Sequence, residues 1–165
     1  MSETTFRKLT GIFFIVGAIL VNIPFTLLII NFDYPDILRQ PVGEILTRFQ
    51  AAGDALIYIW LAFAWVGLPL LLGTIMLKRI LERENSLFLE TATTLGVIGF
   101  IIQVIGLLRW VFVVPVLARL FTDPTTDPAT QASISPVFIA VHQYGGVVLG
   151  EHIGQLFTIL WMSII

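Results

Sequence analysis

The chain has 165 residues, of which 57% are hydrophobic and 12% are charged, and its formal net charge is −2. Soluble domains carry about 25% charged residues, so this composition, with a mean hydropathy of +0.94, indicates a membrane protein. Cysteine is absent, which excludes disulfides, thiolate metal sites and cysteine nucleophiles. The small net charge, without a basic run, gives no indication of a nucleic-acid partner.

Four apolar segments are long enough to cross a bilayer. They cover about residues 9–32, 55–77, 91–120 and 136–165. A helix of about 20 apolar residues spans a hydrocarbon core roughly 30 Å thick, and the first two segments contain no charged residue at all. We therefore predict an all-α, polytopic transmembrane bundle of four spans that forms a single domain in the lipid bilayer.

The polar segment 33–54 between the first two spans contains its own helical pattern. Apolar residues follow Pro41 at helical spacing, and Glu44 and Arg48 are placed to form an i,i+4 pair on the opposite side. We expect a short helix lying in the membrane interface here. The later polar segment 122–133 is rich in Asp, Pro and Thr, and we expect the fourth span to begin near Ser135 and Pro136.

The distribution of Lys and Arg predicts the orientation of the bundle. Five basic residues lie beside the spans on one side and three on the other. The first set is Arg7, Lys8, Lys78, Arg79 and Arg83, and the second is Arg39, Arg48 and Arg119. Because basic residues favour the cytoplasm, we expect the N-terminus and the loop that ends near Glu90 to lie on the cytoplasmic side of the plasma membrane, and segments 33–54 and 122–133 to lie outside.

Two charged residues fall inside predicted spans, where charges are costly and usually serve a site. They are Arg109 in the third span and Glu151 in the fourth. Their predicted depths differ by about one helical turn, so a buried Arg109–Glu151 pair is our first expectation. Two alternatives stay open: Arg109 extends to the outer headgroups, or both residues line a water-filled cavity without pairing.

Gly146, Gly150 and Gly154 form two overlapping GxxxG units in the fourth span. Such a stripe lets another helix approach closely, and that partner is either a helix of the same chain or a second copy in a homo-oligomer. Such a stripe more often serves helix packing than forms a ligand-binding groove. At 100° per residue, Glu151 and Gln155 lie together on one flank of the stripe.

The remaining polar residues of the last two spans complete a candidate ligand-binding cluster. Gln103, His142 and His152 join Arg109, Glu151 and Gln155 in it. The two histidines lie about 15 Å apart on one helix and cannot share a metal ion. A histidine alone in a membrane helix is more often a packing residue, although either could titrate near neutrality. We expect no metal site, no cofactor and no catalytic residue.

Four segments of the chain resemble a known family: Phe32–Arg39, Gly106–Pro115, His142–Gly146 and Gly150–Gln155. The resemblance is to bacterial integral membrane proteins grouped as domain of unknown function 4386. It implies no established activity, cofactor or substrate. It does imply about two further spans, and the chain stops at Ile165 without a basic anchor. We therefore expect a truncation before further spans.

The polar cluster favours a small transporter or ligand sensor, since charges at mid-depth and proline-interrupted helices mark binding sites in transporters. An assembly subunit that docks through the glycine stripe is the alternative. A membrane-embedded enzyme is the third class, and no catalytic motif supports it.

Overall fold

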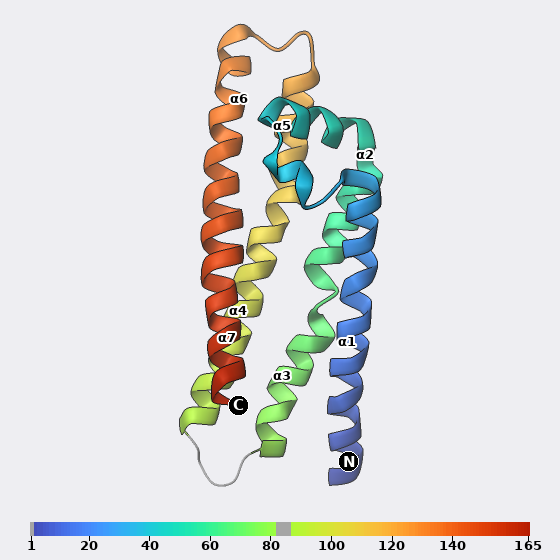
Figure 1. Ribbon diagram of the computed structural model, residues 1–165, viewed down its shortest axis with the longest axis vertical. Helices are drawn as coiled ribbons and strands as arrows, with labels where there is room; N and C mark the ends of the chain where they lie inside the picture. Colours follow the sequence, from blue (N-terminus) through green and yellow to red (C-terminus); the bar gives the residue numbers. More distant parts are fainter. Residues whose placement is uncertain (1, 82–86) are drawn as a thin grey trace.

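The computed structural model describes residues 2–81 and 87–165. Within these ranges the chain is helical almost throughout and contains no strand. Four helical stretches are long and apolar enough to cross a membrane: 3–32, 42–81, 87–122 and 128–164. They run alongside one another in Figure 1. The prediction of an all-α bundle with four spans is confirmed.

The first stretch is a single helix, α1 (Glu3–Phe32), which begins before the predicted residue 9. Its start is capped by Ser2, whose hydroxyl accepts a hydrogen bond from the backbone N–H of Thr5. Pro24 lies buried inside the helix without ending it. The helix ends at Asp33, whose positive φ of 56° turns the chain into the short 3₁₀-helix η1 (Asp36–Arg39).

The predicted interface helix exists, but it is the first part of a longer element. Helix α2 (Val42–Trp65) starts directly after Pro41 and changes direction at Gly53. The backbone there has φ 66° and ψ −163°, a conformation that only glycine adopts readily. Figure 1 shows the first part of α2 crossing one end of the bundle before the chain descends.

The expected ion pair in this segment was wrong. Arg48 donates a hydrogen bond to Asp33 at 3.3 Å and not to Glu44. The reason is tertiary: the end of α1 brings the Asp33 carboxylate beside α2, a contact that i,i+4 spacing cannot reveal.

The other three spans are each composed of more than one helix. The second continues from α2 into α3 (Leu68–Leu81) after a break at Val66 and Gly67. The third consists of α4 (Leu87–Phe112) and α5 (Val114–Thr122). The fourth consists of α6 (Pro128–Val141), the π-helix η2 (His142–Gly154) and α7 (Gln155–Ile164).

The helix of the fourth span begins at Pro128, before Ser135, where we expected the span to start. The Asp127 carboxylate accepts hydrogen bonds from the backbone N–H groups of Ala129 and Thr130, and Pro128 occupies the first turn. Together they start a helix that continues through Pro136.

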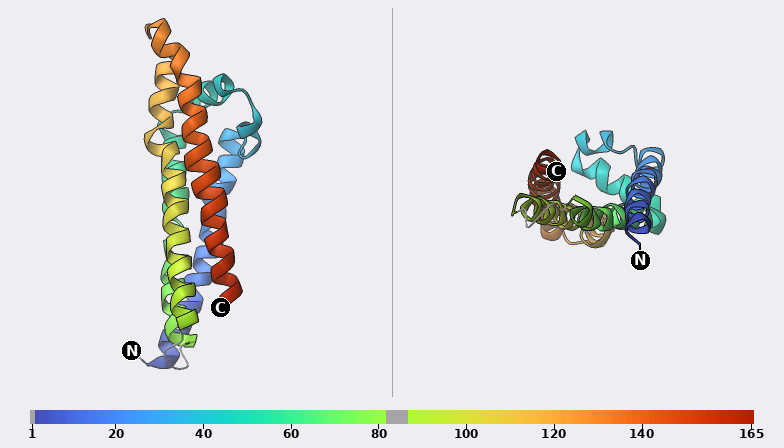
Figure 2. Two further views of the ribbon diagram at one scale, coloured as in Figure 1. Left: turned by 90° about the vertical axis from the view of Figure 1, so that its left-hand side faces the viewer. Right: turned by 90° about the horizontal axis from the view of Figure 1, so that it is seen from below.

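The polar connections alternate between the two ends of the bundle, as predicted. Residues 33–41 and 123–127 lie at one end, which we call the loop end, and both chain termini lie toward the other (Figures 1 and 2). At that other end, Lys78 of α3 forms an ion pair with Glu90 of α4 at 3.0 Å. Arg83 lies outside the described residues. Which end faces the cytoplasm stays a prediction.

An aromatic core holds the loop end together. The rings of Trp60 and Trp110 stack with centroids 4.7 Å apart and planes 6° apart. Phe32 meets both edge-on, at 6.4 and 5.5 Å, and Phe49 stacks on Trp110 at 5.9 Å. Both indoles are fully buried. This packing joins α1, α2 and α4 and fixes the wall against which the polar residues lie.

Candidate functional site

A pocket of about 200 Å³ lies between α4 and η2, toward the loop end. Glycines of both helices line it, and so do Leu107 and six polar or aromatic side chains. These are Tyr34, Phe63, Gln103, Arg109, Glu151 and Gln155. The pocket therefore contains four of the six residues of the predicted polar cluster, drawn from two different spans.

Arg109 is held against the wall of this pocket. Its Nη1 donates a hydrogen bond to the carbonyl of Gly106, and its guanidinium carbon lies 5.3 Å from the centroid of the Trp110 ring. The Nε atom is buried and has no hydrogen-bond partner within the described part of the chain. The guanidinium stays between the helices, so it does not extend to the headgroups.

Glycines make room for this side chain. A Cβ atom on Gly146 would lie 2.6 Å from Arg109 Nη2 and 2.8 Å from its guanidinium carbon. A Cβ on Gly154 would lie 2.6 Å from Cγ of Gln103. Since real Cβ contacts are never so short, only glycine fits at these positions without a shift in the structure.

The partner of the glycine stripe is therefore α4 of the same chain. The backbones approach most closely at Gly106, where an added Cβ would lie 2.6 Å from the Gly145 carbonyl oxygen and 3.2 Å from Cα of Gly150. The predicted close packing is present. Residues of α4 contact the stripe at Gly146 and Gly154, and docking of a second copy on the stripe stays a prediction.

The helix that carries the stripe is a π-helix over its whole length, His142–Gly154. Its i→i+5 hydrogen bonds give more residues per turn than an α-helix has, so the angular positions predicted at 100° per residue do not apply here. π-Helical turns are rare and occur frequently at functional sites.

Glu151 lies on the same pocket but does not pair with Arg109. No ion pair joins them, although both are within the described residues, and Glu151 is exposed on η2. The expected direct pair was wrong. Both charges line one pocket without contact, and the water-filled cavity of the third alternative stays a prediction.

Tyr34 brings a phenol to the two charges. Burial raises the pKa of the Tyr34 phenol; the positive charge of Arg109 acts in the opposite direction, and the negative charge of Glu151 adds to the increase. Both charges thus act on the same hydroxyl. The Tyr34 ring is held edge-on against Trp60, with centroids 5.2 Å apart.

The two histidines of the predicted cluster do not line the pocket. The His142 ring stacks on Phe138 at 5.6 Å and lies 6.1 Å from Trp110, which is a packing role. His152 is exposed. Gln103 does line the pocket, and its side-chain amide donates to the Thr158 hydroxyl at 3.1 Å.

Tyr34 and Phe63 are the aromatic lining residues, and the sequence did not indicate them. Both are ordinary aromatic residues in segments remote from α4 and η2, and no spacing rule connects them to Arg109. Tyr34 stands within Phe32–Arg39, one of the segments that carry the family resemblance.

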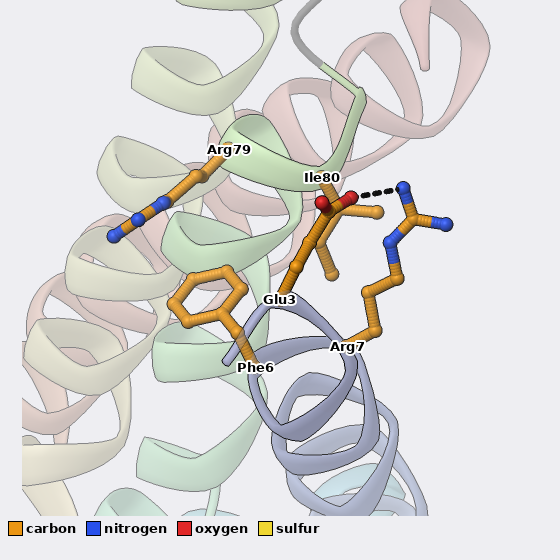
Figure 3. A pocket seen from close by; sticks show the side chains of 5 residues that line it. All are labelled: Glu3, Phe6, Arg7, Arg79 and Ile80. Atoms are coloured by element: carbon orange, nitrogen blue, oxygen red, sulfur yellow. Dashed lines mark hydrogen bonds and ion pairs between the residues drawn. The ribbon is translucent and has the colours of Figure 1, made fainter. Parts of the chain in front are cut away.

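A second pocket, of about 340 Å³, lies at the end opposite the loop end, and three charged side chains, Glu3, Arg7 and Arg79, are among the residues that line it. Figure 3 shows the side chains of Arg79 and Arg7 on opposite sides of it, with Glu3 between them. Arg7 pairs with Glu3 at 2.6 Å, and the Arg79 guanidinium lies 4.9 Å from the centroid of the Phe6 ring. The contact of Arg79 with Phe6 joins α3 to α1, whereas the Arg7–Glu3 pair lies within α1.

The spans and the intramembrane pocket define the class: this is a multi-pass α-helical membrane protein. The chain belongs to the family described as a domain of unknown function (DUF4386), which matches residues 9–165. No curated protein and no solved structure matches it. The family resemblance expected from the four sequence segments is confirmed.

Proposed function

We propose that the protein is a small transporter or ligand sensor whose binding site is the pocket between α4 and η2. The guanidinium of Arg109 carries the proposal. It has five N–H donors, yet it makes a single hydrogen bond to the described chain, with the Gly106 carbonyl. A charged group in a membrane span is a site candidate by default, and one with free donors on a pocket is a stronger one.

Interrupted helices beside the pocket support the same role. Helix α4 ends at Phe112, three residues after Arg109, and η2 contributes a π-helical wall. Discontinuous helices next to polar groups at membrane depth are typical of transporter binding sites. The break between α2 and α3 at Gly67 adds a third interruption in the same bundle.

The pocket volume limits the ligand to a small solute. Sites for drug-sized ligands measure about 300–1,000 Å³, and this pocket is smaller, about 200 Å³. The assembly alternative is weakened because residues of α4 contact the glycine stripe. The enzyme alternative still has no motif behind it.

Thiol labelling in the cysteine-free chain tests the proposal. In membranes, Gln155→Cys should react with a water-soluble maleimide, because a hydrated pocket allows the reactive thiolate to form. The matched control is Ile159→Cys, one helical turn along α7 at a side chain that is 58% exposed and that we expect to face lipid. If the thiols of both variants prove equally unreactive, the pocket is dry and the proposed site is wrong.

A further inference from the structure

We propose that the pocket binds a small zwitterion, with the ligand's carboxylate at Arg109 and its ammonium group at Glu151. This rests on the proposed function and specifies its ligand class. Two unlike charges face one pocket of about 200 Å³ without touching each other, and a ligand with both charges can satisfy both residues at once.

Arg109 suits a carboxylate. Its planar guanidinium presents paired N–H donors that match the two oxygens of a carboxylate. One face of the guanidinium is already supported by the Trp110 ring at 5.3 Å, and the hydrogen bond to Gly106 fixes one edge. The side chain is therefore oriented before a ligand arrives, which lowers the entropic cost of binding.

Glu151 suits an ammonium group. Its carboxylate has no hydrogen bond or ion pair with any residue that the structure describes. Gln155 also lines this pocket. A simple anion at Arg109 would leave Glu151 as an unpaired charge at membrane depth, where such charges are costly.

The gap between the two charges has an apolar wall. Phe63 and Leu107 line the pocket together with Arg109 and Glu151. The carbon chain that separates the two charged groups of an amino acid can contact these side chains. A ligand of one charge, or one much larger than an amino acid, would leave part of this arrangement unused.

Thermal unfolding of the purified protein tests the ligand class. The probes are glycine, β-alanine and γ-aminobutyrate, which separate the two charges by increasing lengths, with propionate and propylamine as the matched half-molecules. At saturating concentration, at least one zwitterion should raise the Tm by about 2–4 °C, and neither half-molecule should. In Arg109→Gln no ligand should raise the Tm. In Glu151→Gln the zwitterion should raise the Tm no more than propionate does.

Labelling of Gln155→Cys gives a readout that does not require the charge variants to fold. The best zwitterion should slow its reaction with maleimide at least about tenfold near saturation, and propionate should not. If propionate protects equally, the ligand is a simple anion and the zwitterion assignment is wrong. If the thiol reacts but no amino acid protects it, the hydrated site stands and this ligand class is rejected. If the thiol does not react at all, the proposed function itself fails.

Discussion

Replacing Gly106 with Ala tests how closely α4 and η2 must pack to form the site. The new Cβ would lie 2.6 Å from the Gly145 carbonyl oxygen, with the Cα and N of Gly150 at 3.2 and 3.3 Å. All three neighbours are backbone atoms, so no side chain can rotate away. The helices must separate, and the wall of the pocket must move with them.

Two opposing terms determine the magnitude. Overpacking a tight contact costs about 1–3 kcal/mol, while Ala is favoured over Gly in a helix by about 0.8–1.0 kcal/mol. Gly11→Ala in α1 is the matched control, because no atom lies within 4 Å of its added Cβ. Both variants gain the same helical preference, so the difference between them isolates the contact. We expect Gly106→Ala to be the less stable of the two by about 1–3 kcal/mol.

Reversible unfolding in detergent, followed by circular dichroism, measures this difference. Gly150→Ala provides an internal check within η2, since its added Cβ would meet nothing closer than 3.6 Å and should be tolerated. Equal stability of the Gly106→Ala and Gly11→Ala proteins would refute the close approach of α4 and η2, and the pocket geometry that depends on it.

Three further predictions concern the core, the orientation and the start of α6. Trp110→Ala should lower the free energy of unfolding by about 3 kcal/mol or more, because this indole is 0% exposed. The control is Phe112→Ala, which should be tolerated because Phe112 is 68% exposed. Equal losses of stability in detergent would contradict the aromatic core. Because segment 122–133 is predicted to lie outside, Thr126→Cys should react with an impermeant maleimide in intact cells. Reaction only after permeabilisation would show that the protein has the opposite orientation. Hydrogen bonds from Thr130 hold the pKa of the Asp127 carboxyl below its usual 3.8. Its contribution to stability is therefore present above that pH and is lost as the pH falls through the lowered pKa, so Asp127→Ala should lower the Tm more at pH 7 than at pH 2, with Asp127→Asn intermediate.

The sequence was sufficient to predict the number of spans and four of the six residues of the polar cluster that line the candidate pocket. Apolar segments, the charges within them and the glycine spacing are local features, and each depends only on what a membrane helix must contain. Arg109 and Glu151 were selected because charges are rare at that depth. The structure places both on one pocket.

What the sequence could not indicate depends on contacts between segments. The π-helical backbone of η2 changes the direction in which each side chain after His142 points, and the spacing of the residues does not predict a π-helix. Arg48 forms its ion pair with Asp33 and not with Glu44 because the end of α1 brings Asp33 beside α2. The same is true of Tyr34, which reaches the pocket only because the chain turns at the end of α1.

The glycines of the fourth span explain why packing and binding cannot be separated in this protein. Gly146 lets the Arg109 guanidinium lie flat between two helices, and Gly106 and Gly150 line the pocket while they set the distance between α4 and η2. A larger residue at any closely packed glycine would move the wall and the charged group together. Close helix contact in a membrane is achieved with small residues, and here the same small residues leave the space in which Arg109 and Glu151 face one cavity without meeting. Stability and ligand affinity should therefore change together along this contact, whereas substitutions in the Trp60 and Trp110 core should affect stability first.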